Sequence, residues 1–147
     1  MSKKDGPSLV KEMAMTEPFA RMLNIKVLEV KAGYARVQAT IRREMLNIHG
    51  ITHGGALFAL VDEAFELASN SHGTMAVALN MNITFFAPTG PGDTLTAEAK
   101  EVFRTNRTAT YQIEVTKDEG GLIATCQALV YRKKDPLPGL DNRKNTP

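Results

Sequence analysis

One long helical pattern among six strand patterns is the feature that most limits how this chain can fold. Apolar residues follow the helical period from His53 to Ser71. The strand patterns, two before this helix and four after it, cover residues 25–30, 34–42, 75–86, 94–104, 107–117 and 122–132. Turns at Thr105–Asn106 and Asp118–Gly121 predict that the last three strands form hairpins. This order predicts an α+β fold in which an antiparallel sheet wraps around the central helix.

The composition is that of a single globular domain. The chain has 147 residues, of which 43% are hydrophobic and 23% are charged, and a chain of this size buries enough surface to form a core without disulfides. We expect the domain to span residues 9–134 and to begin with a helical stretch that is interrupted before Pro18. The polar start (1–8) is expected to be disordered and the proline-containing end (135–147) to be flexible.

Charge and cysteine content argue against several classes of protein. A net charge of +2 is small for a nucleic-acid binder. The single cysteine, Cys126, allows no intrachain disulfide and is typical of a reducing cytoplasm. The start of the chain lacks the apolar stretch of a secretion signal. Acidic residues interrupt the most apolar segment, 56–68, so no membrane association is expected.

A helical wheel divides the central helix into three stripes. The apolar stripe, which we expect to meet the sheet, holds Leu57, Leu60, Val61, Ala64, Leu67 and Ala68. A mostly polar stripe holds Ala59, Glu63, Glu66 and Asn70, and its two carboxylates are interpreted as solvated surface. The third stripe holds Phe58, Asp62, Phe65 and Ser69. Two phenylalanines that face away from the core need a ligand or a second subunit to cover them, whereas Asp62 is either an ordinary surface carboxylate or a functional one.

Two glycines, Gly54 and Gly55, stand where the central helix begins. They fit either a tight turn or a site at which a ligand oxygen reaches the first-turn amides, which lie at the positive end of the helix dipole. Such amides can stabilise the oxyanion of an acyl-transfer intermediate. Asn47 and His53 add polar groups beside them, and His53 fits a capping role as well as a substrate contact. The pair His49 and His53 lacks an acidic third ligand at metal-binding spacing, so no metal site is expected.

The spacing of Gly54 and Asp62 limits how they can act together. They are eight residues apart on one helix, which corresponds to about 12 Å. One reacting carbonyl cannot contact both, because catalytic contacts need about 3 Å. If both act on one substrate, a two-fold dimer must bring Asp62 of one chain to Gly54 of the other.

The run Asn47-x-x-Gly50-x-x-His53-Gly54-Gly55 followed by Asp62 resembles the phenylacetate-degradation (PaaI-like) branch of the hotdog-fold acyl-CoA thioesterases. The resemblance covers residues 16–133, including the order of the elements. It implies the hotdog fold, a six-stranded antiparallel sheet wrapped around one helix, and assembly into homodimers and dimers of dimers. It also implies hydrolysis of an acyl-CoA substrate to free coenzyme A and a carboxylic acid, with no metal or redox cofactor.

The resemblance also implies catalytic roles. Asp62, from the partner chain, would activate water or attack the thioester, and Gly54 would supply the oxyanion amide. Asn47 and His53 would hold the thioester carbonyl and the water. Some relatives carry a water-holding serine on the third strand where this chain has Ala78, so Asn80 or solvent would have to serve.

Coenzyme A carries phosphates, so its site should offer positive charge. Arg104 and Arg107 bracket a hairpin turn and are either solvated or suited to bidentate phosphate binding. In similar thioesterases this turn and the loop after the third strand contact the coenzyme. The expected substrate-contact residues are Gly55, Phe65, Phe86, Pro88, Thr89, Gly90, Arg104, Thr105, Asn106, Arg107 and Thr108.

The acyl group is expected in an apolar pocket at the dimer seam. Its candidate walls are Phe58, Phe65 and Leu46, and its candidate adaptable side chains are Met13, Met15, Met22 and Met45. These residues fit ordinary packing as well. An aryl group and a medium-length aliphatic chain are both compatible with the sequence.

Two other functions compete with hydrolysis. A non-catalytic acyl-CoA sensor would have the same fold, but Asp62 beside an anionic ligand favours chemistry over binding. A hotdog dehydratase would need a catalytic histidine and acid in a pattern that His49 and His53 do not supply.

Overall fold

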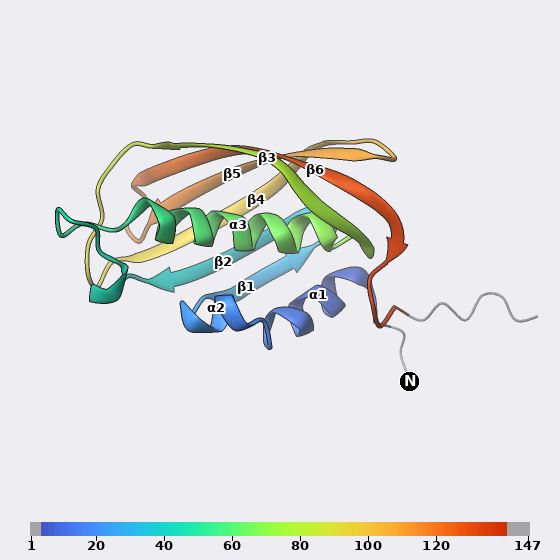
Figure 1. Cartoon of the computed structure of the whole chain (residues 1–147), viewed down its shortest axis with the longest axis horizontal. Coiled ribbons are helices and arrows are strands. Elements are labelled where there is room, and N and C mark those ends of the chain that lie inside the picture. The colour runs from blue at the N-terminus through green and yellow to red at the C-terminus, as the bar shows by residue number, and fades with distance from the viewer. Residues whose placement is uncertain (1–3, 141–147) are drawn as a thin grey trace, which may run out of the picture.

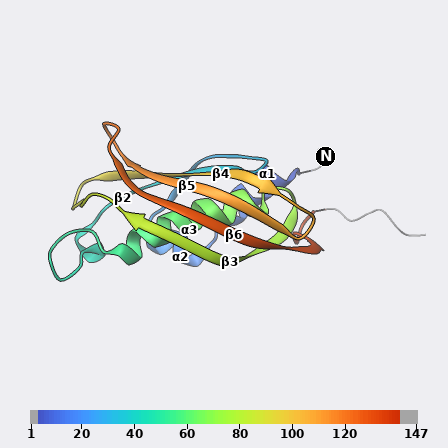
Figure 2. The ribbon, with the colours of Figure 1, turned by 90° about the horizontal axis from the view of Figure 1, so that it is seen from above.

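A computed structural model describes residues 4–140. In that range the elements are α1 (Gly6–Ala14), α2 (Pro18–Met22), β1 (Lys26–Lys31), β2 (Tyr34–Thr40), the 3-10 turn η1 (Arg43–Met45), α3 (Gly54–Asn70), β3 (Thr74–Phe85), β4 (Thr94–Arg104), β5 (Thr108–Lys117) and β6 (Leu122–Pro136). The six strands form one antiparallel sheet in the order β1-β2-β4-β5-β6-β3. The sheet curves around α3 (Figures 1 and 2). The predicted α+β fold and both predicted hairpins are therefore confirmed.

The core lies between α3 and the concave face of the sheet. All six residues of the predicted apolar stripe of α3 are buried. Alternate residues of β2 and β4 cover them, namely Ala35, Val37, Ala39, Leu95, Ala97 and Ala99. This period of two is what a strand with one buried face produces. The helix α1 packs against both α3 and β1.

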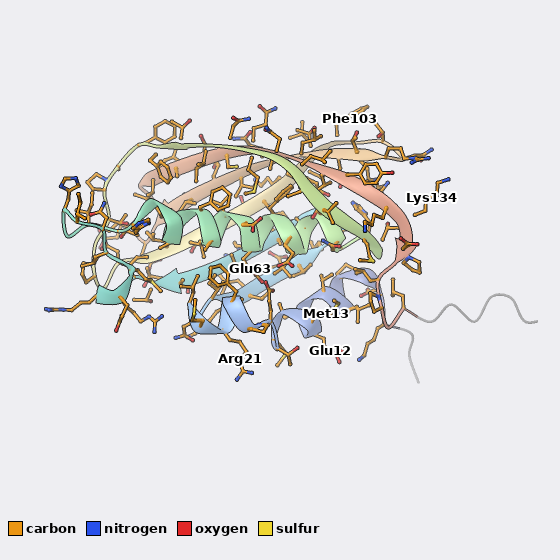
Figure 3. All side chains as sticks on the ribbon, viewed as in Figure 1. Glu12, Met13, Arg21, Glu63, Phe103 and Lys134 are labelled. Atoms are coloured by element: carbon orange, nitrogen blue, oxygen red, sulfur yellow. The ribbon has the colours of Figure 1, made fainter. Side chains whose placement is uncertain are left out.

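Two sequence interpretations of the other α3 stripes are wrong. Phe65 faces the protein's own core: it is 1% exposed, and its ring packs edge-to-face on Tyr111 at 5.6 Å. Glu63 is only 5% exposed rather than solvated. Figure 3 shows Glu63 on the side of α3 that faces the two N-terminal helices. A helical wheel shows the direction in which each side chain points, but not how much of the helix surface other elements bury. Here the sheet and the α1–α2 segment together bury most of the surface of α3.

Both ends of the domain extend beyond the predicted limits. Helix α1 already begins at Gly6, because Asp5 caps it by accepting a hydrogen bond from the Ser8 amide at 2.9 Å. Strand β6 continues to Pro136, and the buried Leu137 donates its amide to the Gly73 carbonyl at 2.9 Å. Residues 6–8 therefore belong to α1 and residues 135–136 to β6, outside the expected domain limits of 9 and 134. Residues 1–3 and 141–147 lie outside the described part of the chain.

Strand β3 forms one edge of the sheet and pairs only with β6 among the described strands. Its middle exposes large apolar side chains, including Val77 and Leu79, the latter 58% exposed. An exposed apolar edge strand is a surface on which another strand can pair. In the part of the chain that the structure describes, no helix is both long and apolar enough to cross a membrane.

Candidate active site

The first turn of α3 leaves one backbone amide without an acceptor. His53 is the N-cap, and its Nδ1 accepts a hydrogen bond from the Gly55 amide at 2.8 Å. The amides of Ala56 and Leu57 both donate to the His53 carbonyl, at 2.9 and 3.3 Å. Within the described chain, the Gly54 amide is the one first-turn donor with no partner. It therefore remains available to a ligand at the positive end of the helix dipole.

A side chain would meet different neighbours at Gly54 and at Gly55. A side chain at position 55 would place its Cβ 2.9 Å from Nδ1 of His53, so Gly55 permits the cap. A Cβ at position 54 would lie 3.4 Å from the ring of Phe85. The Gly55 amide, expected from sequence to contact substrate, is instead engaged by His53. Because Nδ1 accepts, a neutral His53 ring carries its proton on Nε2 and can donate from there.

Asn47 closes the loop that precedes α3. Its Oδ1 accepts from the amides of His49 and Ile51, at 2.9 and 3.3 Å. The Asn47 amide in turn donates to the Ile51 carbonyl at 2.8 Å. With its oxygen held in this way, Asn47 offers its Nδ2 group as a donor.

A groove of about 500 Å³ joins several of the predicted residues. Its lining comprises Asn47, Ile51, Thr52, Gly54, Leu57, Phe85, Phe86, Ala87, Pro88 and Thr89. The structure thus brings together Asn47, Gly54 and the loop after β3. Phe85, the last residue of β3, belongs to the stretch 85–90 that the resemblance predicts to contact the coenzyme, whereas sequence reasoning missed Thr52.

Thr89 lines this groove, whereas Gly90 follows it in the loop and is not part of the lining. The Thr89 hydroxyl is buried and donates to Oγ1 of Thr52 at 2.7 Å, and the Thr52 amide donates to the Thr89 carbonyl at 2.9 Å. The Gly90 amide donates to Oδ2 of Asp93 at 2.9 Å. The two contacts between Thr52 and Thr89 tie the loop after β3 to the residue that precedes the N-cap of α3.

Asp62 lies in a second groove, of about 290 Å³, farther along α3. This groove is lined by α3 and β3, including Ala78, and by Phe19 at the start of α2. Partial removal from water raises the pKa of Asp62, and the nearby charge of Glu17 raises it further. Gly54 and Asp62 therefore occupy separate grooves within one chain, as their spacing requires.

The turn between β4 and β5 lies at the opposite end of α3 (Figure 1). Arg104 contacts His72, which follows the last turn of the helix. The 17 residues of α3 make it about 25 Å long. Within one chain, the predicted phosphate-binding turn, residues 104–108, is thus remote from Gly54.

A basic groove of about 420 Å³ adjoins this turn. Its lining is Thr74, Asn106, Arg107, Arg132, Lys133 and Lys134. Arg132 is held in place by donating from Nη1 to the Thr105 carbonyl at 2.8 Å. Sequence reasoning missed the last three of these residues, because the basic run at 132–134 falls where the strand pattern of β6 was expected to end.

Comparison with known proteins decides the family. The model of the thioesterase superfamily matches residues 49–124, more than half of the chain. The chain belongs to the thioesterase superfamily. This thioesterase-family chain is 42% identical over 126 residues to a putative esterase of Archaeoglobus fulgidus, covering 86% of this chain and 82% of the relative. It is 38% identical to the acyl-coenzyme A thioesterase PaaI of Escherichia coli, covering 82% and 86%.

Solved structures place the chain in the PaaI-like branch of the superfamily. The Escherichia coli PaaI protein, from the phenylacetic acid degradation operon, superposes with a TM-score of 0.84 at 34% identity, covering 88% of this chain and 96% of that one. A Streptococcus mutans protein in a structure bound to acetyl CoA superposes with a TM-score of 0.74 at 26% identity, covering 77% and 91%. The hotdog fold expected from sequence is confirmed for this PaaI-like thioesterase-family member.

Proposed function

We propose that this chain hydrolyses an acyl-CoA thioester, with an aryl or medium-length acyl group, to free coenzyme A and a carboxylic acid. The observation that carries the proposal is the unpartnered Gly54 amide. This donor lies at a helix N-terminus, where it can stabilise the negative charge of an oxyanion. The acyl-CoA thioesterase of Escherichia coli and the acetyl CoA bound to the Streptococcus mutans protein support the choice of substrate.

In the proposed reaction, the thioester carbonyl oxygen accepts a hydrogen bond from the Gly54 amide. The Nδ2 group of Asn47 and Nε2 of His53 add donors for the carbonyl and the attacking water. Asp62 either takes a proton from that water or attacks the carbonyl carbon itself. In the first case water adds to the carbonyl carbon, the carbon–sulfur bond breaks, and the thiolate takes up the proton that Asp62 removed. In the second case the carbon–sulfur bond breaks as a mixed anhydride with Asp62 forms, and the thiolate takes up a proton from solvent. Water then hydrolyses the anhydride, which releases the carboxylic acid and restores the Asp62 carboxylate. These groups need no metal or redox cofactor for the reaction.

We propose that two chains share each site. Gly54 and Asp62 lie in separate grooves, and the β3 edge exposes apolar side chains. Pairing of two β3 strands about a two-fold axis would set the two α3 helices antiparallel. Asp62 of the partner then approaches Gly54. The partner's basic groove then lies near the N-terminal end of α3, where Gly54 is. Phosphates of coenzyme A would bind there, contacting the arginines bidentately. A dimer of dimers is the larger assembly that this proposal allows.

An apolar pocket of about 480 Å³ is the proposed place for the far end of the acyl group. It adjoins the Asp62 groove, because Glu17, Glu66 and Ala76 line both. Its other walls include Val10, Met13, Leu67, Met75 and Leu137. Among the predicted adaptable methionines, Met13 lines this pocket, whereas Met45 is buried in the core.

Release of free thiol from a panel of acyl-CoA substrates tests the proposal. Asp62→Asn keeps the size of the side chain but removes the charge that a base or nucleophile needs, so we expect kcat to fall at least 100-fold. Asp118→Asn, in the exposed turn before β6, is the matched control and should keep full activity. If the wild-type chain binds acyl-CoA but releases no thiol from any substrate, it is a sensor and the proposal fails.

The cytoplasm is the proposed location of this activity. Its basis is the single cysteine of the chain, Cys126, which is a free, buried thiol.

A further inference from the structure

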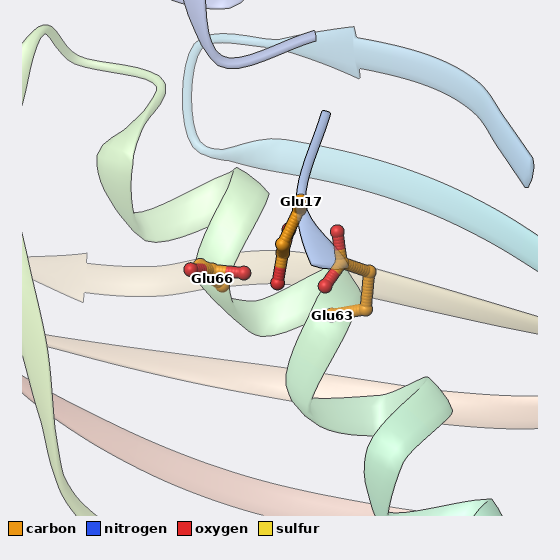
Figure 4. Close-up of side chains that lie close together, drawn as sticks. All are labelled: Glu17, Glu63 and Glu66. Carbon is orange, nitrogen blue, oxygen red and sulfur yellow. The ribbon is translucent and has the colours of Figure 1, made fainter. Parts of the chain in front are cut away.

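Three carboxylates from two parts of the chain meet in the wall of the Asp62 groove. Glu63 and Glu66 lie one turn apart on α3, and Glu17 is the residue that precedes α2. One oxygen from each lies within 4.8 Å of the other two. Figure 4 shows Glu17 reaching between the two α3 side chains. We refer to these three residues as the carboxylate cluster.

One oxygen of the cluster is buried without a partner. Glu63 is 95% buried, and its Oε1 is shielded from solvent with no hydrogen-bond donor in the described chain. A buried polar atom left in this state is costly, and most such atoms in folded proteins have a partner. The orphaned oxygen belongs to a side chain that points into the cluster, so it indicates that a donor or a cation belongs there.

Within residues 4–140, no positive charge lines the grooves at the cluster. The described residues that line the two adjoining grooves include Glu17, Asp62, Glu63 and Glu66 but no lysine, arginine or histidine. Three carboxylate oxygens that lie within 4.8 Å of one another repel each other when they are ionised. A cation between the three oxygens would remove this repulsion.

The spacing and chemistry of the cluster select the kind of cation. Calcium binds oxygen ligands at 2.3–2.6 Å, so two of its ligands lie no more than about 5 Å apart. The separation limit of 4.8 Å in the cluster meets this condition. Carboxylates suit hard ions such as Ca²⁺ and Mn²⁺, and the absence of histidine and cysteine from the described cluster disfavours softer ions.

We propose that Glu17, Glu63 and Glu66 bind one hard divalent cation of about the size of Ca²⁺, which fixes the α1–α2 segment against α3. This departs from the expectation, drawn from sequence, that the chain holds no metal. The ligands of this structural ion are distinct from Gly54 and Asp62, although Glu17 and Glu66 also line the proposed acyl pocket. Binding of the ion is measured without reference to hydrolysis. Failure of one proposal therefore leaves the other standing.

Direct binding of Mn²⁺ to the chelator-treated full-length chain, followed by electron paramagnetic resonance of the free ion, tests the site. We expect one bound ion per chain, displaced by Ca²⁺, and at least a tenfold weaker affinity in Glu63→Gln and in Glu66→Gln. Glu114→Gln changes an exposed glutamate on β5 and should bind as wild type does. Stoichiometric binding that survives both cluster variants would place the ion elsewhere and overturn the proposal.

Thermal unfolding provides a second readout. A cation that binds only the folded chain raises the midpoint, by roughly 5–10 °C at a hundredfold excess over Kd. We expect this rise in wild type and Glu114→Gln and its loss in Glu66→Gln, whose changed side chain is exposed and should leave folding intact. If neither Ca²⁺ nor Mn²⁺ shifts the wild-type midpoint, protons alone neutralise the cluster and no cation site exists.

Discussion

His53 combines two roles at the residue scale that sequence could not separate. Its Nδ1 caps α3 by accepting from Gly55, which leaves Nε2 free for substrate in the proposed reaction. The sequence identified both residues but left open whether His53 caps or binds, because the decision depends on which ring nitrogen faces the helix. Because the cap occupies the Gly55 amide, that amide cannot bind the oxyanion. The Gly54 amide is then the first-turn donor left in the described chain for the proposed oxyanion contact.

Two substitutions at position 53 separate these roles. His53→Ala removes the cap and should lower the free energy of unfolding by about 1 kcal/mol. His53→Asn keeps a capping oxygen, so its urea midpoint should stay close to wild type. Both variants lack Nε2 and should lose activity alike. If His53→Asn kept wild-type kcat/KM, His53 would have no role beyond the cap.

Gly55→Ala tests the same contact from the other side. The new Cβ would meet Nδ1 of His53 at 2.9 Å and force the ring away. We expect this variant to lose about as much stability as His53→Ala, measured by urea unfolding. In the double variant the two losses should not add, because both remove one hydrogen bond.

At the scale of elements, a partly buried network joins β4, β5 and the end of α3. Glu101 on β4 accepts from Tyr111 of β5 at 2.9 Å and lies 2.5 Å from Nε2 of His72, which follows α3. Burial raises the pKa of Glu101, but hydrogen bonds from His72 and Tyr111 outweigh it, and the pKa lies below its ordinary value. The ionised form of Glu101 therefore stabilises the fold.

The pH dependence of Glu101→Gln follows from this sign. A carboxyl group whose pKa is lower in the folded chain than in the unfolded chain stabilises the fold at pH values above its unfolded pKa. This stabilisation is lost as the pH falls through the folded pKa. We expect Glu101→Gln to be less stable than wild type by about 1–3 kcal/mol at pH 7. The gap should narrow as the pH falls below about 4.5, which is the ordinary value for glutamate. Guanidinium unfolding of both proteins at pH 7 and pH 3 measures this difference in the free energy of unfolding. A difference that is the same at both pH values would contradict the stabilising role of ionised Glu101.

Most elements could be predicted from sequence because their residues alternate or repeat with a clear period. The apolar stripe of α3 was correct for this reason. The end of β6 was missed because Pro136 reads as a strand terminator, although proline is tolerated at the end of a strand. Phe65 and Glu63 were misplaced because their burial depends on the curvature of the sheet and on the α1–α2 segment. Both are long-range features that a local pattern does not contain.

At the scale of the whole molecule, the β3 edge is the surface on which the proposed dimer depends. Leu79 stands in an irregularity of β3 and is exposed, and Val102 stands in a similar irregularity of β4. Leu79→Lys should place a charge at the pairing edge and shift the protein toward monomers in analytical ultracentrifugation. We expect at least a tenfold fall in activity per chain with it. Val102→Lys, matched in exposure and local geometry, should remain dimeric.

Mixed dimers test whether sites are shared. Asp62→Ala and Asn47→Ala chains should each be inactive alone. After random subunit exchange of equal amounts, half of the dimers hold one chain of each kind, and one of their two sites is intact. Activity should recover to about a quarter of the wild-type value for two-fold dimers. Native mass spectrometry confirms the exchange, and no recovery after it would show that each site lies within one chain.

The separation of Gly54 and Asp62 by two turns of a rigid helix has a consequence for regulation by abundance. In the proposed assembly an isolated chain carries two half-sites and no whole one. Specific activity must then rise with protein concentration and level off once nearly every chain has found a partner. The length of α3 would thereby set a threshold of protein concentration. Below it the chains are monomeric and inactive, and above it they form dimers that catalyse the reaction.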